Sequence, residues 1–227
     1  MIEPKEIIKS RRKTIALVID HDGELIVRAP FYATQKDVMY FIQEKQEWLE
    51  QKSLEMKEKM KRTPTLSWSD GEEILYMGKS CKIRRGDFRQ FHFDGESFWI
   101  PNHLEPVTVM TKWYRNAAAG LIAPRVEELA KIMEEEPAGI RITSARTRWG
   151  SCSYDNHLNF SWRLMMCPKS VIDYVIIHEL SHIQHKDHSK AFWKRVEKFD
   201  PHYRQHDSWL SDHQRLMEVI KGKGDET

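Results

Sequence analysis

The sequence predicts an α+β fold in two parts: a β-rich N-terminal subdomain that carries one long helix, and a C-terminal subdomain in which a helix lies beside a small sheet. Three observations predict it. Apolar residues alternate along short segments near the N-terminus, which is the period of a half-buried strand. An apolar stripe at helical spacing follows at residues 38–49, within a predicted helix at 34–62. Later in the chain, an apolar segment contains the pattern H-E-x-x-H, which is typical of a metal-binding helix.

The first two elements follow from local patterns. Residues 14–20 and 24–29 alternate around a His-Asp-Gly turn signal, which predicts a β-hairpin. Thr34 and Asp37 have the spacing of a capping box, which predicts that the helix at 34–62 begins there.

Further strands are predicted where turn signals separate short aromatic and β-branched segments. They are expected at residues 74–76, 81–84, 90–93 and 98–100. Together with the hairpin and the long helix, they predict an N-terminal β-rich subdomain at residues 1–103.

The C-terminal subdomain is expected at residues 104–220, followed by a disordered tail at 221–227. Its first helix should be kinked or broken at Pro124. The expected elements are a helix at 107–136, strands at 139–143 and 158–164, the H-E-x-x-H helix, and helices at 191–199 and 208–220.

His178, Glu179 and His182 form the H-E-x-x-H pattern. Residues four apart lie on one face of a helix, so both imidazoles can reach one metal ion. Glu179 is close enough to hold a water molecule at the metal without being a ligand. This is the arrangement of the zincins, in which two His bind zinc and a Glu is the general base. Without a ligand, these three side chains would be costly to bury on so apolar a helix.

A catalytic zinc ion usually has a third protein ligand and one open position. His185 continues the helical face, but it would lie about 10 Å from His178 along the axis, and zinc–nitrogen bonds are only about 2 Å long. A turn at Lys186-Asp187 would instead bring back His188. We therefore favour His188 as the third ligand, ahead of Glu197 and then His185.

The sequence also resembles a known family. The resemblance rests on RTRWGSC at 146–152, NFSWRL at 159–164, YVIIHELSH at 174–182 and HSKAFW at 188–193. These segments closely resemble the YgjP-like metallopeptidase family, compact bacterial and archaeal zincins related to SprT-like proteases. The resemblance runs from Arg11 to about Leu210. It implies that His178, His182 and His188 bind the metal and that Glu179 is the base, and it implies no particular substrate.

The expected function is zinc-dependent hydrolysis of peptide bonds, with one Zn²⁺ per chain, a zinc-activated water and Glu179 as general base. Two alternatives stay open. A DNA-associated protease of the SprT-like kind would dock through residues 11–13 or 141–148. A non-catalytic zinc-binding module would close its site with a fourth ligand, such as His185 or Cys152, although such a site needs no base beside it.

The sequence contains further candidates for substrate binding. Arg141, Arg146 and Arg148 cluster before Trp149, and structural pairing with acidic groups is favoured over substrate or phosphate binding. In the strand at 158–164, alternate polar side chains point to one side. By analogy with zincins, this strand is expected at the edge of the sheet, where a peptide substrate can pair with it.

The segment after the predicted helix at 191–199 contains three candidate transition-state donors, Tyr203, Arg204 and His206. The favoured interpretation is that Tyr203 packs and that the other two lie at the surface.

Composition narrows the choice of partners. The 227 residues carry a net charge of +2, so charge alone indicates neither nucleic acid nor a membrane as a partner. Three widely spaced cysteines, Cys81, Cys152 and Cys167, predict reduced thiols in a cytoplasmic protein. The charged residues 1–10 predict no signal peptide, and no segment is apolar enough to span a membrane. The expected partner is a peptide or protein substrate.

Overall fold

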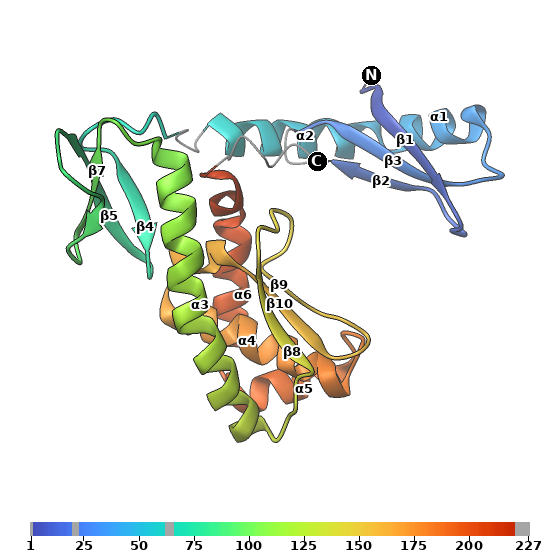
Figure 1. The fold of residues 1–227 in the computed structure, drawn as a ribbon. Helices are drawn as coiled ribbons and strands as arrows, with labels where there is room; N and C mark the ends of the chain where they lie inside the picture. Colours follow the sequence, from blue (N-terminus) through green and yellow to red (C-terminus); the bar gives the residue numbers. More distant parts are fainter. Residues whose placement is uncertain (1, 20–22, 62–65, 221–227) are drawn as a thin grey trace. The chain divides into compact units, whose positions relative to one another are not determined.

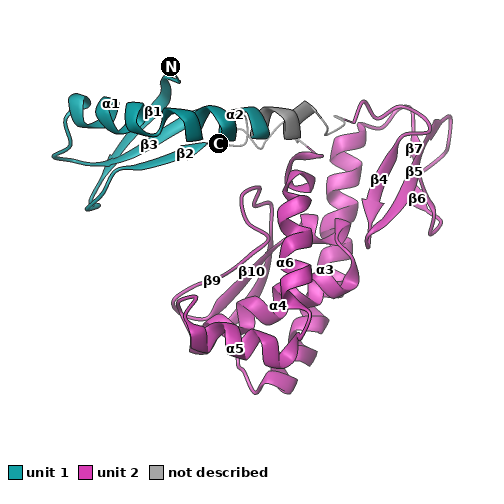
Figure 2. Cartoon of the chain, turned by 180° about the vertical axis from the view of Figure 1, so that it is seen from behind, with its two compact units in different colours: residues 1–64 teal, residues 65–227 magenta. Residues whose placement is uncertain are grey.

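The structure is a computed structural model that describes residues 2–19, 23–61 and 66–220. It divides into two compact units, residues 1–64 and residues 65–227, which Figure 2 shows in different colours. The predicted boundary between residues 103 and 104 lies inside the second unit. The predicted turn residues His21 and Asp22 and the predicted tail at 221–227 lie outside the described residues.

Unit 1 is a three-stranded sheet with the order β1-β3-β2. Strand β1 (Pro4–Ser10) runs parallel to β3 (Leu25–Pro30), and β2 (Ala16–Ile19) runs antiparallel to it. The predicted hairpin is thus confirmed as β2 and β3, whereas β1 was not predicted. One face of the sheet is buried by residues of the two helices, in a core made of Leu25, Val27, Ala29, Ala33, Val38, Ile42 and Leu49.

The predicted helix at 34–62 is two helices, α1 (Gln35–Glu44) and α2 (Gln46–Lys61). The capping box of Thr34 and Asp37 is present at the start of α1. Lys45 leaves the helical backbone, and its N–H bonds back to the carbonyl groups of Gln43 and Ile42. This tightened last turn ends α1, which the apolar pattern alone does not reveal.

Unit 2 begins with a four-stranded sheet with the order β4-β5-β7-β6. Its strands are β4 (Glu73–Tyr76), β5 (Lys79–Gly86), β6 (His92–Phe93) and β7 (Ser97–Pro101), close to the predicted ranges. The sheet shares one core with the long helix α3 (Pro106–Met133), because Phe98 packs on Tyr114 and the Tyr114 hydroxyl donates to the carbonyl of Leu75 at 2.6 Å. This shared core explains why the boundary lies before this sheet.

Helix α3 begins where the Glu105 side chain accepts the N–H groups of Val107 and Thr108, and it ends at Glu134 in a left-handed conformation. The helix continues through Pro124, so the predicted break is absent. Pro124 is exposed, and the carbonyl that its missing N–H leaves free can therefore be solvated.

The third sheet has the order β8-β10-β9. Strand β10 (His157–Ser161) lies between β8 (Gly139–Thr143), to which it is parallel, and β9 (Gly150–Cys152), to which it is antiparallel. The prediction that the strand at 158–164 is an edge strand is therefore wrong. It is central, and it ends at Ser161, after which residues 162–166 form the 3-10 helix η1 (Trp162–Met166).

Four helical segments complete unit 2: α4 (Lys169–Gln184), α5 (Lys190–Phe199), α6 (Tyr203–Asp212) and the short η2 (Gln214–Glu218). Helix α4 contacts α3, α5, α6 and β9, so it lies at the centre of this part of the fold (Figure 1). The predicted helix at 208–220 is the end of α6 followed by η2, because α6 already begins at Tyr203. Among the described residues, no helix is long and apolar enough to cross a membrane.

Candidate metal centre

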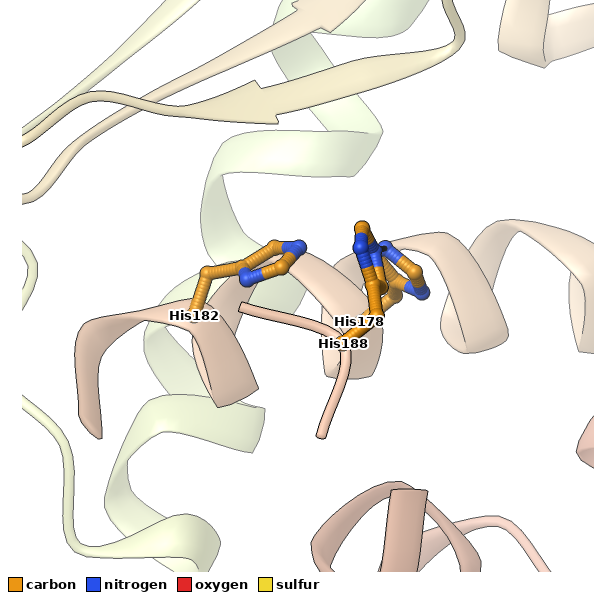
Figure 3. Close-up of side chains that lie close together, drawn as sticks. All are labelled: His178, His182 and His188. Carbon is orange, nitrogen blue, oxygen red and sulfur yellow. Dashed lines mark hydrogen bonds between the residues drawn. The ribbon is translucent and has the colours of Figure 1, made fainter. Parts of the chain in front are cut away.

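Three histidines converge from two parts of the chain (Figure 3). His178 and His182 lie one turn apart on α4, and His188 lies on the segment that follows the helix. One ligand nitrogen from each lies within 4.8 Å of the others, and the Nε2 atoms of His178 and His188 are 3.2 Å apart. Two nitrogens bound tetrahedrally at about 2.05 Å would be about 3.3 Å apart, so this spacing suits a shared metal ion.

A short turn brings His188 back to the helix. His185 leaves the helical conformation directly after α4, with its N–H bonded to the Ser181 carbonyl. Asp187 accepts the N–H of Ser189, whose hydroxyl in turn caps α5 by accepting the N–H of Phe192. The turn is the one that the sequence predicted at Lys186-Asp187. The buried Phe192 ring then stacks on the His182 ring, with centroids 4.4 Å apart.

The protonation of these rings suits metal binding. Burial, and then the neighbouring His182 and His188, lower the pKa of His178 to about 3, so His178 is neutral at physiological pH. The Nδ1–H of His182 donates to the carbonyl of His185 at 2.9 Å, which leaves the Nε2 lone pair of His182 free. The His178 Nδ1 atom is buried and has no hydrogen-bond partner among the described residues. Neutral imidazoles with free lone pairs are the donor set of a transition metal.

The other ligand candidates stay outside this group. Within the described part of the chain, the cluster contains only the three histidines. Glu197 is exposed on α5, His185 contributes a backbone carbonyl, and Cys152 lines the same pocket without joining the cluster.

Glu179 points toward the same pocket and is 6% exposed. Burial raises its pKa to about 8, against the opposing effects of the Arg148 charge and the N–H of Cys152. A Cβ atom on Gly150 would lie 2.7 Å from Glu179 Oε1, so the backbone of β9 approaches the carboxylate as closely as only glycine permits. The sequence signal for this contact was the glycine that follows Trp149, which was not connected to Glu179.

The cluster lines a pocket of about 310 Å³ together with Glu179, Lys186 and all of β9. The Lys186 ammonium donates to the Asn156 side chain at 2.6 Å and to the Ser153 carbonyl at 3.0 Å. From the sequence, Lys186 was expected only as a turn residue, and of β9 only Cys152 was a candidate for the site, as a possible fourth ligand.

The remaining candidates lie elsewhere. His206 donates from Nδ1 to Asp200 Oδ2 at 2.7 Å. Arg204 donates to the hydroxyl of Tyr203, and the ring of Tyr203 stacks on Trp193. None of the three candidate transition-state donors lines the pocket, and Tyr203 packs on Trp193, as the favoured interpretation predicted. Residues 11–13 belong to unit 1, between β1 and β2.

Comparison with known proteins identifies the family. The family described as "YgjP-like, metallopeptidase domain" matches residues 13–213. The chain belongs to the YgjP-like metallopeptidases. This membership implies a peptidase that acts on a protein substrate, and it confirms the resemblance seen in the sequence. No curated protein matches the chain.

Two crystal structures of archaeal proteins are similar to part of this YgjP-like chain. The metallopeptidase zymogen abylysin of Pyrococcus abyssi is 21% identical, with a TM-score of 0.38, over 41% of this chain and 96% of that one. The metallopeptidase zymogen jannalysin of Methanocaldococcus jannaschii is 18% identical, with a TM-score of 0.37, over 40% of this chain and 95% of that one.

Proposed function

We propose that this chain is a zinc-dependent peptidase in which His178, His182 and His188 hold one Zn²⁺ and Glu179 is the general base. The observation that carries the proposal is the convergence of three ligand nitrogens within 4.8 Å, in one pocket with a buried carboxylate. A structural zinc site has no need of that carboxylate.

The three histidines are suited to hold the ion as neutral ligands. When bound, zinc supplies Lewis acidity toward a carbonyl oxygen and lowers the pKa of water. The hydrogen bond from His182 to the His185 carbonyl fixes the orientation and tautomer of that ring, and the stacked Phe192 restricts it further. Three imidazoles also accept other first-row metals, and zinc is proposed because the H-E-x-x-H pattern is typical of zinc peptidases.

Glu179 is suited to move a proton. Its pKa of about 8 without a metal lies close to physiological pH, where a general base and acid is most effective. A nearby cation would lower that pKa and favour the carboxylate form that accepts a proton from water. The N–H of Cys152 and the close backbone of Gly150 hold the side chain in place. In this proposal, Glu179 takes the proton from water and delivers it to the leaving amine.

The substrate strand is proposed to pair with β9 instead of β10. The Trp149 carbonyl accepts the N–H of Ser161, and the N–H of Ser153 donates to the His157 carbonyl, so residues 149 and 153 face β10. By the alternation of an antiparallel ladder, the backbone groups of Gly150 and Cys152 face away from β10. The Cys152 N–H is used by Glu179. The carbonyl groups of both residues and the N–H of Gly150 therefore remain for a peptide.

The experiment is cleavage of a mixed peptide library by the full chain, followed by mass spectrometry. Cleavage should stop when zinc is removed with a chelator and return when one equivalent of Zn²⁺ is added back. The same preparation of Glu179→Gln controls for contaminating proteases. Cleavage that persists after chelation, or equally in Glu179→Gln, would contradict the proposal.

A further inference from the structure

A second pocket lies beside the proposed zinc pocket and shares β9 with it. Its volume is about 190 Å³, below the roughly 300–1,000 Å³ of pockets that hold small-molecule ligands, so its size suits one side chain or chain end. The residues that line it are Thr143, Ala145, Arg148, Gly150, Ser151, Asn159 and Ser161. Gly150 and Ser151 also line the pocket of the histidine cluster, so the two pockets adjoin at the edge strand.

The lining of this pocket favours an anion. It contains no acidic side chain and one cation, Arg148. The Ser151 hydroxyl oxygen accepts a hydrogen bond from Asn159, which leaves its own proton free to donate, and Asn159 keeps a second N–H. Guanidinium, hydroxyl and amide donors together form a site for a carboxylate.

Arg148 is available to bind such a group. Among the described residues, its guanidinium has no hydrogen bond and no ion pair, although its charge acts on Glu179. The structural pairing that the sequence favoured for this arginine is therefore not made. Lys186 provides the contrast at the other end of β9, because its ammonium is already bonded to Asn156 and Ser153. Between these two side chains, it is Arg148 whose N–H groups make no hydrogen bond among the described residues and can bind a carboxylate.

The register of the sheet directs a substrate side chain to this pocket. Gly150 faces Glu179, so Ser151, the next residue of the strand, faces the opposite side of the sheet together with its partner Asn159. Residues that lie opposite each other on paired strands point to the same face. A substrate residue opposite Ser151 would therefore point into the space lined by Ser151, Asn159 and Arg148.

We propose that this pocket, next to the zinc pocket, binds a carboxylate of the peptide substrate and that Arg148 selects for it. The proposal rests on the function proposed above and adds a substrate preference to it. The carboxylate belongs either to an acidic side chain close to the scissile bond or to the C-terminus of a short peptide. Both sources present the same two oxygens to the planar fork of the arginine.

The experiment measures kcat/KM for quenched fluorescent peptides in which one Glu is moved through each position around the scissile bond. A peptide with Gln at the same position is the neutral match. One position should favour Glu by about fivefold, the upper end of the range for a solvent-exposed pair, mostly through KM. The preference should shrink when ionic strength is raised from about 0.1 M to about 1 M. A free and an amidated C-terminus distinguish the two sources of the carboxylate.

Variants assign the preference to Arg148. Arg148→Gln should bring the Glu-to-Gln ratio near one, Arg148→Glu should make a Lys peptide the better substrate, and Arg148→Lys should restore part of the preference. Arg89→Gln is the matched control, because Arg89 is exposed between β5 and β6 and does not line either pocket. An unchanged Glu-to-Gln ratio in Arg148→Gln would overturn the proposal.

Binding separates this proposal from the peptidase proposal. Fluorescence anisotropy of the same peptides on the full chain needs no turnover. Glu-selective binding that depends on Arg148, without cleavage, would support the carboxylate pocket and count against the peptidase. Cleavage or binding without any preference for Glu, or no binding at all, would overturn the carboxylate pocket.

Discussion

Two carboxylates on helix α4 have opposite surroundings. Asp173 accepts two hydrogen bonds from Arg125 of α3, at 2.7 and 2.9 Å. Glu179, further along the same helix, is more deeply buried and has no ion pair among the described residues. The first carboxylate joins two helices. The second lies in a pocket with three histidines, and burial has raised its pKa to about 8.

This difference separates structural from chemical roles on one helix. A buried polar group that is fully paired contributes to stability, whereas an unpaired one is costly and marks a candidate functional site. The unpaired Nδ1 of His178 belongs to the same region as Glu179. Changes at Glu179 should therefore alter activity without loss of stability, and changes at Asp173 should do the reverse.

The largest effect is expected for Glu179→Gln. Activity should fall by about 10²–10⁴-fold, the usual contribution of general acid–base catalysis. Zinc content should stay the same, and the melting temperature should stay the same or rise, because the amide has no charge to desolvate. Kinetics, metal analysis and calorimetry on one preparation measure all three. A large loss of stability with activity retained would show that Glu179 has a structural role and not a chemical one.

Gly150→Ala should displace the Glu179 carboxylate, because the added Cβ would lie 2.7 Å from Oε1. A displacement of about 1 Å can reduce the rate about 10²-fold, so kcat should fall by about that factor with zinc retained. Gly120→Ala is the matched control, since a Cβ there meets nothing within 4 Å. It should leave kcat unchanged. Equal kcat in the two variants would show that Gly150 does not position Glu179.

Asp173→Asn should destabilise the fold and leave kcat unchanged. Charge-assisted hydrogen bonds contribute about 1.5–3 kcal/mol each, and these are partly buried, so we expect a loss of about 1–3 kcal/mol in the free energy of unfolding. Glu128→Gln removes an exposed partner of the same arginine and should therefore cost less than Asp173→Asn. Urea denaturation measures both. An equal loss in both variants would contradict a special role for Asp173.

The smallest effect concerns Asp94, a fully exposed but hydrogen-bonded carboxylate. Its bond from the Trp99 indole, and then the backbone N–H groups of Glu96 and Ser97, lower its pKa from 3.8 to about 2. Because the pKa of Asp94 is lower in the folded state, its hydrogen bonds stabilise the fold. This stabilisation is fully present above pH 3.8 and is lost as pH falls through about 2. Asp94→Asn should thus lower the melting temperature slightly at pH 7, and the difference from wild type should narrow toward pH 2.

Parts of the site were predictable because they depend on spacing along one helix. His178, Glu179 and His182 needed only the helical period, and His188 followed from the reach of a short turn. The edge strand was not predictable in this way. Which strand lies at the edge depends on pairing between distant segments, and β9 is only three residues long, too short to show an alternating pattern.

The fold shows the same limit. The hairpin of β2 and β3, the strands β4 to β7 and the capping box at Thr34 all have local signals. The boundary between the units depends on which face Phe98 buries, and it buries that face against Tyr114 in α3. Pro124 is a local signal for a break, but the helix continues, because at this exposed position water can solvate the carbonyl that lacks a partner.

The most direct test of the account is the zinc content of the full chain, purified without a histidine-rich tag, for wild type, His188→Ala and Glu197→Ala. Native mass spectrometry after exposure to one equivalent of Zn²⁺ gives the stoichiometry. We expect one zinc per chain in wild type and in Glu197→Ala, and a clear loss in His188→Ala. Full occupancy in His188→Ala, or no uptake by the wild type, would contradict the three-histidine centre.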